Sequence, residues 1–333
     1  MRCICSHTTA LWYWYLAGPA GFSRARPFAG SLLGNATHSP GPSPVPDLAA
    51  VGVVPCPPAM MPSAHLDGQV DLLISRRDSW RAPDGVRLHR WNGSFPAGSL
   101  YTIDDDVLVC SPELALLQTA RMLSDVQVIR LAMTLCARYY IDQETNRVRE
   151  REPLTSIGRI QMLLSQAFRR CGVRRCGRLL PFAAEPAASP AEIETYLLTS
   201  LPPVMGGYGL DGAELNGKID LTDVDDCLLD RDDRQFARVD LYWRNERVGI
   251  EYQSKEHDEQ LPKDRRRINM LTSLGESIFQ VDTEQRSDVT MFHTTMAQVA
   301  HRMRRTLPDP TEEWMSRRSA LRRELLGANR MKL

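Results

Sequence analysis

Two strand-like segments joined by a four-residue turn constrain the fold of this chain more than any other feature. The first segment is ARVDLYW, the turn is RNER, and VGIEYQ follows as the second segment. A hairpin centred between Asn245 and Glu246 fixes the register of the two strands. This register predicts that Asp240 lies directly opposite Glu251, with both carboxylates on one face of the sheet.

Strand alternation predicts which of these side chains share a face of the hairpin. One face is expected to carry polar groups together with a tyrosine and a glycine: Arg238, Asp240, Tyr242, Gly249, Glu251 and Gln253. The other face is expected to point into the core with four apolar side chains: Val239, Leu241, Val248 and Ile250. The polar run continues past the second strand to Lys255 and His257, so several titratable groups gather at one end of the hairpin.

Two carboxylates on paired strands repel each other. Cross-strand Cβ atoms lie about 5 Å apart, a spacing at which two negative charges lower stability. A divalent cation between Asp240 and Glu251 would remove that cost, and magnesium prefers such hard oxygen ligands. In that position it would polarise a phosphoryl oxygen and supply a hydroxide nucleophile. The alternative is a solvated hairpin face that carries a chance acidic pair.

Three segments occur in a characteristic order within roughly residues 189–307: VDLYW, IEYQSKEH and KDRRRINMLTSLGESIFQVD. This order resembles that of the PD-(D/E)XK nuclease superfamily, in particular proteins related to very-short-patch repair endonucleases. The resemblance implies a restriction-endonuclease-like fold that hydrolyses DNA phosphodiester bonds, with Mg²⁺ or Mn²⁺ held by Asp240 and Glu251. It also implies that Glu192, on the preceding helix, is a third acidic ligand.

One position departs from the pattern of that superfamily. Members often carry lysine two residues after the second acid, where this chain has Gln253. A glutamine orients a water molecule but supplies no positive charge, although it does occur there in some active members. Lys255 lies two residues farther along and completes the candidate catalytic group of Asp240, Glu251, Gln253 and Lys255. The departure leaves open a second class, a non-enzymatic protein whose nuclease-like fold binds only nucleic acid or a partner.

The overall charge does not indicate a nucleic-acid-binding protein, because 41 basic and 41 acidic residues give a formal net charge of +0. Contacts with DNA would come from local groups, and the candidates near the acidic pair are His257, Arg265, Arg266 and Arg267. These arginines are interpreted either as a phosphate clamp or as a solvated helix face. The same two interpretations apply to an earlier cluster: Arg169, Arg170, Arg174, Arg175 and Arg178.

The first part of the chain has a different pattern. Short strand-like runs (VDLLIS, VRLHRW and DVLVC) are bounded by turns, and a helix opens after Ser111 with proline in its first position. The segments SHTTALWYW, SPELALLQTARML and SPAEIETYLLTSLPPVMGGYGL resemble proteins similar to the AbiEi antitoxins of abortive-infection toxin–antitoxin systems. This resemblance implies a cognate toxin protein as partner. No convincing helix-turn-helix precedes Ser111.

These patterns predict an α/β (α+β) protein of about two domains. The expected regions are a β-rich and helical antitoxin-like region (1–150), an arginine-rich helical connector (151–188), a nuclease-like mixed sheet flanked by helices (189–307) and a C-terminal helix (308–333). Eight scattered cysteines without a C-x-x-C pair are typical of a reduced, cytoplasmic protein. No apolar run is long enough to span a membrane, and His7 and two threonines interrupt the opening run, which disfavours a signal peptide.

Overall fold

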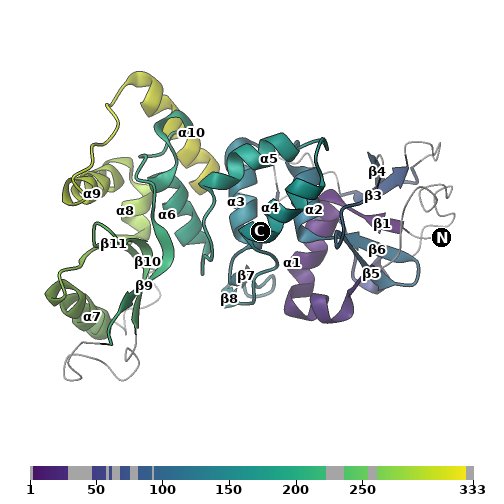
Figure 1. Ribbon diagram of the computed structural model, residues 1–333, viewed down its shortest axis with the longest axis horizontal. Coiled ribbons are helices and arrows are strands. Elements are labelled where there is room, and N and C mark those ends of the chain that lie inside the picture. The colour runs from purple at the N-terminus through teal and green to yellow at the C-terminus, as the bar shows by residue number, and fades with distance from the viewer. Residues whose placement is uncertain are drawn as a thin grey trace. The chain divides into compact units, whose positions relative to one another are not determined.

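The computed structural model describes residues 3–28, 47–57, 60–61, 68–75, 82–91, 94–222, 236–253 and 261–327. The protein is mixed α/β, as predicted, and divides into two compact units, Met1–Ala183 and Ala184–Ala328 (Figure 1). The division falls near the end of the expected connector, residues 151–188. Among the described helices, none is both long and apolar enough to cross a lipid bilayer.

The first unit is built on a six-stranded sheet with the order β2-β5-β6-β1-β3-β4. The central strand β1 runs parallel to β6 and antiparallel to β3, so the opening residues of the chain lie in the middle of the sheet. Three of the strands match the predicted runs. The strands are β1 (Cys3–Cys5), β2 (Arg26–Pro27), β3 (Val70–Ser75), β4 (Val86–Trp91), β5 (Leu100–Asp104) and β6 (Val107–Cys110).

Helix α1 (His7–Arg24) follows β1 directly and buries Leu11 and Trp14. Helix α2 (Pro112–Thr119) begins as predicted, because the Ser111 side chain accepts a hydrogen bond from the backbone N–H of Leu114. The next helix is α3 (Asp125–Leu135). The unit continues with α4 (Ile157–Gln166), α5 (Val173–Leu179) and two short 3₁₀ turns, Ala49–Val51 and Leu180–Phe182.

The expected boundary between residues 1–150 and 151–188 lies inside the first unit, in a polar stretch from Ile141 to Pro153. Strands β7 (Tyr139–Ile141) and β8 (Val148–Glu150) form an antiparallel hairpin there. The Tyr15 hydroxyl ties this hairpin to α1 by donating to the carbonyl of Ile141, 3.0 Å away. Polar residues therefore mark a surface hairpin at this position and not a break between domains.

The second unit has a four-stranded mixed sheet with the order β12-β11-β10-β9. The predicted hairpin register is confirmed where pairing is formed, with Leu241 opposite Ile250 and Trp243 opposite Val248. Strands β11 and β12 are parallel and are connected through α7. The elements are α6 (Pro190–Ser200), a 3₁₀ turn (Pro203–Met205), β9 (Glu214–Asp220), β10 (Phe236–Trp243), β11 (Val248–Gln253), α7 (Leu261–Ser273), β12 (Ser277–Asp282), α8 (Thr283–Ser287), α9 (Val289–Arg302) and α10 (Glu312–Leu326).

The prediction that side chains along β10 alternate strictly between a polar and an apolar face is wrong. Val239 and Tyr242, three residues apart, are both buried in the apolar cluster that also contains Met270 and Leu271 of α7. A Cβ on Gly249 would lie 2.5 Å from Cγ1 of Val239, which shows how closely β10 and β11 pack on that side. Tyr242 is therefore a core residue and not part of a polar face. The alternation shifts between Val239 and Tyr242, in the part of the strand that carries Asp240.

Candidate active site

Asp240 lies on β10, one residue before Leu241, which pairs with Ile250 of β11. Its Oδ2 accepts a hydrogen bond from the backbone N–H of Tyr252 at 2.7 Å. The carboxylate of Asp240 is therefore held against β11, beside the position of Glu251. The sequence predicts Asp240 directly opposite Glu251, but among the described residues the paired positions of the two strands end at Leu241 with Ile250, so that pairing stays a prediction.

Glu192 approaches the same place from α6. Burial, followed by the negative charge of Glu192, raises the pKa of Asp240 to about 7, against the effects of the Tyr252 N–H and the Arg267 charge. Burial also raises the pKa of Glu192. Its Oε2 accepts hydrogen bonds from the Ala188 N–H and from the Asn216 amide, each at 2.8 Å. Asp240 and Glu192 are thus both buried and close enough to repel each other when ionised, and both effects favour the protonated carboxyl group.

Glu251 is 9% exposed and forms an ion pair in which its Oε1 lies 2.7 Å from a guanidinium nitrogen of Arg267. Arg267 comes from α7 and also donates to the backbone carbonyl of Arg238 on β10. Its guanidinium therefore connects the helix to both hairpin strands. The sequence predicts Arg267 as a DNA contact, and in this structure it neutralises the second acid of the predicted pair.

The remaining predicted site residues are distributed around the end of β11. Gln253 is half-buried at the last position of β11, opposite Asp282 of β12. Arg266 is exposed on α7. Arg265 belongs to the same helix, but its side chain lies outside the described set. Lys255 and His257 also lie outside the described residues.

A divalent cation is compatible with the pair Asp240 and Glu251. Magnesium commonly takes one or two protein carboxylates and completes its shell with water, and the pKa of Asp240 is raised first by burial and then by the negative charge of Glu192. Glu192 fits less well as a ligand, because its Oε2 already serves two donors. Within the described part of the chain, no three His, Cys, Asp or Glu side chains form a group that could hold a metal ion.

Sequence reasoning missed Asn216, which lies in β9 and binds both Glu192 and the carbonyl of Pro186 through its amide. Its backbone has a φ of 51°, which is unusual in a strand. Asparagine tolerates this left-handed conformation better than most residues. The sequence signal for this irregular backbone is an asparagine directly before Gly217 inside a strand-like run.

No protein-family model, curated protein or solved structure matches the chain. The assignment of function therefore depends on the residues of the site and their surroundings. These are two adjacent acids on a hairpin, a third acid that raises the pKa of one of them, and an arginine paired with the other.

Proposed function

We propose that this protein is a Mg²⁺- or Mn²⁺-dependent DNA endonuclease that acts in the cytoplasm, with its second unit as the nuclease domain. The observation that carries the proposal is the convergence of three acids: Asp240 of β10 accepts from the N–H of Tyr252, the residue after Glu251 on β11, and lies close enough to Glu192 of α6 to interact with its charge. The chain order α6, β9, β10, β11, α7, β12 supports it, because the PD-(D/E)XK resemblance implies a mixed sheet flanked by helices in this region. A role in phage defence follows from the resemblance of other segments to AbiEi-type proteins.

In this proposal Asp240 and Glu251 hold the cation. A bound Mg²⁺ would supply Lewis-acid polarisation of the scissile phosphate and lower the pKa of a bound water. Gln253 orients water through its amide, since it has both donor and acceptor groups. Lys255 and His257 supply positive charge and proton transfer.

The arginines of α7 fit the phosphates of the substrate in the same proposal. The planar guanidinium of Arg267 suits two phosphate oxygens as well as it suits the carboxylate that it contacts here. Arg266 is exposed on the same helix and available to contact the DNA, and Arg265 is the third proposed contact. DNA binding therefore depends on this helix and not on the overall charge of the chain.

One observation favours a second function. The ion pair between Arg267 and Glu251 gives Glu251 an internal cation, and Gln253 replaces the usual lysine. A domain stabilised in this way does not need a metal ion for charge balance. The second candidate is therefore a non-enzymatic, AbiEi-like antitoxin that uses a degenerate nuclease fold to bind a cognate toxin protein.

A paired measurement separates these functions. Thermal stability and plasmid nicking are recorded with Mg²⁺, with Mn²⁺ and with chelator, on the wild type and on Glu251→Gln. The matched control is Glu214→Gln, which removes an exposed carboxylate from the same sheet at its ion pair with Arg244. We expect nicking that is lost in Glu251→Gln and kept in Glu214→Gln.

The other outcomes are also informative. Metal-dependent stabilisation that disappears in Glu251→Gln, without nicking in any protein, would support the degenerate binding domain. Absence of both nicking and any metal-dependent shift in the wild type would show that the acidic pair is a structural remnant.

A further inference from the structure

The first unit contains a basic pocket that the proposed nuclease activity does not use. It is a cavity of about 350 Å³ between the start of α1, strand β4, the end of α2 and the segment after α4. Most of its polar lining consists of imidazole, amide and guanidinium groups: His7, His89, Gln118, Arg90, Arg121 and Arg169. No described residue that lines it is an aspartate or a glutamate.

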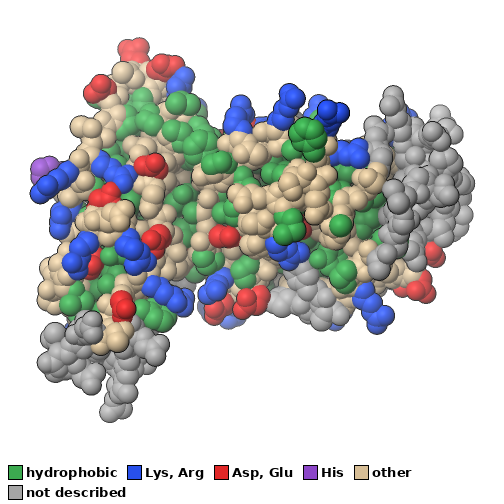
Figure 2. Space-filling model, viewed as in Figure 1, with side chains coloured by type: hydrophobic (Ala, Val, Ile, Leu, Met, Phe, Trp, Pro, Cys, Tyr) green, Lys and Arg blue, Asp and Glu red, His purple; other side chains and the backbone are tan. Residues whose placement is uncertain are grey.

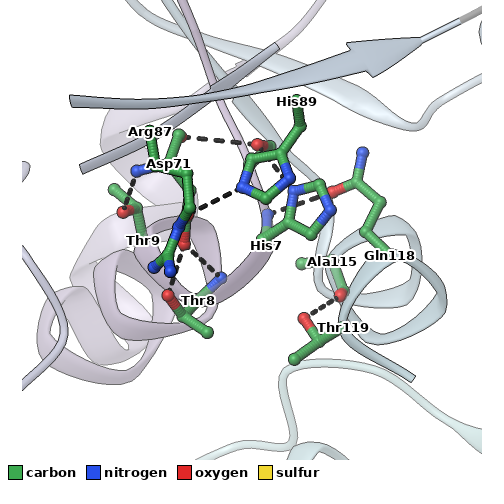
Figure 3. Close-up of polar contacts among 10 residues, drawn as sticks. His7, Thr8, Thr9, Asp71, Arg87, His89, Ala115, Gln118 and Thr119 are labelled. Atoms are coloured by element: carbon green, nitrogen blue, oxygen red, sulfur yellow. Dashed lines mark hydrogen bonds and ion pairs between the residues drawn. The ribbon is translucent and has the colours of Figure 1, made fainter. Parts of the chain in front are cut away.

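A buried carboxylate organises the inner wall of this pocket. Asp71 Oδ1 lies 2.8 Å from Nε2 of His89 and accepts a hydrogen bond of the same length from Arg87 (Figure 3). Its Oδ2 accepts from both the hydroxyl and the backbone N–H of Thr8, at 2.5 and 3.2 Å. The carboxylate is thus turned away from the pocket and fully occupied, and it fixes the orientation of the His89 ring.

The two histidines stack behind the mouth of the pocket. Their ring centroids are 3.6 Å apart with an interplanar angle of 20°. His7 directs Nδ1 to the Ser6 hydroxyl, 2.9 Å away, and its backbone N–H donates to Oε1 of Gln118. The second ring nitrogen of each histidine, Nε2 of His7 and Nδ1 of His89, has no hydrogen-bond partner among the described residues.

The backbone at His7 is also unusual. Its φ is 47°, in the left-handed region that only a few residue types adopt without cost. A strained residue persists only where its surroundings hold it in place, and such residues concentrate at functional sites. Here Ser6 and Gln118 hold His7 at the pocket wall.

The rim of the pocket carries cationic groups that lack acidic partners. Arg90, Arg121 and Arg169 are exposed, and none has a carboxylate partner within the described ranges. Two arginines of α5 differ in this respect, because Arg175 and Arg178 both pair with Asp125. Figure 2 shows Lys and Arg side chains gathered over the region of α5, which follows the 169–171 segment of the pocket wall.

We propose that this pocket binds a phosphate group. Guanidinium groups present forks of N–H donors that match phosphate oxygens, and the described residues of the lining include arginines but no carboxylate, so these residues carry net positive charge. The site recognises the phosphate and not a nucleobase, because Trp91 is already stacked on Phe95 at 5.2 Å and covered by Arg170. The phosphate is supplied by a nucleic acid strand or by a small phosphorylated molecule.

Calorimetric titration of the full chain at low salt tests this site. The probes are inorganic phosphate, pyrophosphate, and a single-stranded DNA oligonucleotide with and without a 5′ phosphate. We expect saturable binding of at least one probe, about tenfold weaker in Arg121→Gln, since one charge-assisted contact is worth that factor. The matched control, Arg174→Gln, removes an exposed arginine of α5 that does not line the pocket and should change affinity less than twofold.

The probes also identify the source of the phosphate. Binding confined to the 5′-phosphorylated oligonucleotide indicates a strand end, and equal binding of both oligonucleotides indicates the strand backbone. Binding of pyrophosphate alone indicates a small molecule. The proposal is overturned if no probe binds, or if Arg121→Gln and Arg174→Gln weaken binding equally. Glu251→Gln should bind phosphate and pyrophosphate as the wild type does. This result can therefore be judged separately from the nuclease proposal.

Discussion

The two units each contain a partly or fully buried aspartate on a strand, and their surroundings shift its pKa in opposite directions. In the first unit burial alone would raise the pKa of Asp71, but hydrogen bonds from His89, Thr8 and Arg87 hold it well below its usual range. In the second unit Asp240 has one backbone donor and an acidic neighbour, and its pKa rises to about 7. The number of donors and the sign of the nearest charge therefore decide what burial does to a carboxyl group.

This contrast separates a structural carboxylate from one available to a ligand. Asp71 is saturated, and its role is to position His89 and Arg87 beside a cationic pocket. Asp240 has one backbone donor and lies near the negative charge of Glu192, and in the proposed function a cation would offset that repulsion. The two proposals therefore assign ligands of opposite charge to the two units, an anion to the first and a cation to the second.

The largest expected change in stability comes from neutralising the two aspartates, one at a time. Asp71→Asn leaves Arg87 and His89 beside a neutral group and should lower the free energy of unfolding of the first unit by about 3 kcal/mol. Asp240→Asn keeps an acceptor for the Tyr252 N–H and removes repulsion from Glu192, so it should cost less than about 1 kcal/mol. Urea denaturation at pH 7 with chelator measures both. Equal losses would contradict the contrast between the two aspartates.

Acidification should act on the two units in opposite directions. Burial, followed by the charge of His89, lowers the pKa of His7 to about 3, whereas the unfolded chain titrates near 6.5. Below pH 6.5 the unfolded state therefore binds a proton that the folded state does not, and the first unit should lose about 2 kcal/mol by pH 5. Asp71, with its lowered pKa, adds to this loss only at lower pH.

Asp240 gives the opposite sign. Its folded pKa of about 7 lies above the unfolded value of 3.8, so between these values the folded state holds the extra proton. The second unit without metal should therefore gain stability as the pH falls from 7 to 5. Hydrogen exchange resolved by unit, corrected for intrinsic rates, measures both slopes. His7→Asn should flatten the slope of the first unit alone, and a slope unchanged in that variant would refute the assignment.

A smaller effect is expected from the arginine that bridges the acid site. Arg267→Gln removes the partner of Glu251 and should cost about 1 kcal/mol in chelator, because the pair is only partly exposed to solvent. The added negative charge should then increase stabilisation by Mn²⁺ beyond that of the wild type. Arg266→Gln, an exposed neighbour on α7, is the control and should change neither quantity. Thermal denaturation with and without Mn²⁺ provides the comparison.

The sequence was sufficient for those features that depend on neighbouring residues. The turn between β10 and β11 and the alternation of their ends fixed the pairing of Leu241 with Ile250, and capping serines located the start of α2. The shift of alternation near Asp240 was not predictable, because it depends on how Tyr242 packs against α7.

The polar sites depend on contacts between distant segments, which the sequence does not display. The ion pair of Arg267 with Glu251 requires the rotation of a helix about its axis, and local periodicity does not determine that rotation. The cluster of His7, Asp71 and His89 brings together three segments whose local patterns predict only a helix and strands, and no functional site. A pocket of this kind becomes visible only when β1, β3 and β4 are adjacent in the sheet.

The smallest expected effect tests whether hydrogen-bond donors control the pKa of Glu192. Asn216→Gly removes the hydrogen bonds to Glu192 and to the carbonyl of Pro186 but adopts a φ of 51° without strain, and should cost about 1 kcal/mol or less. Because a donor to the Glu192 carboxylate is lost, the pKa of Glu192 should rise further, and the gain in stability on acidification should become steeper. Asn245→Ala, in the exposed turn between β10 and β11, should leave that slope unchanged. Unit-resolved hydrogen exchange between pH 7 and 5 distinguishes the two variants, and equal slopes would mean that burial alone, without hydrogen bonding, controls this carboxyl pair.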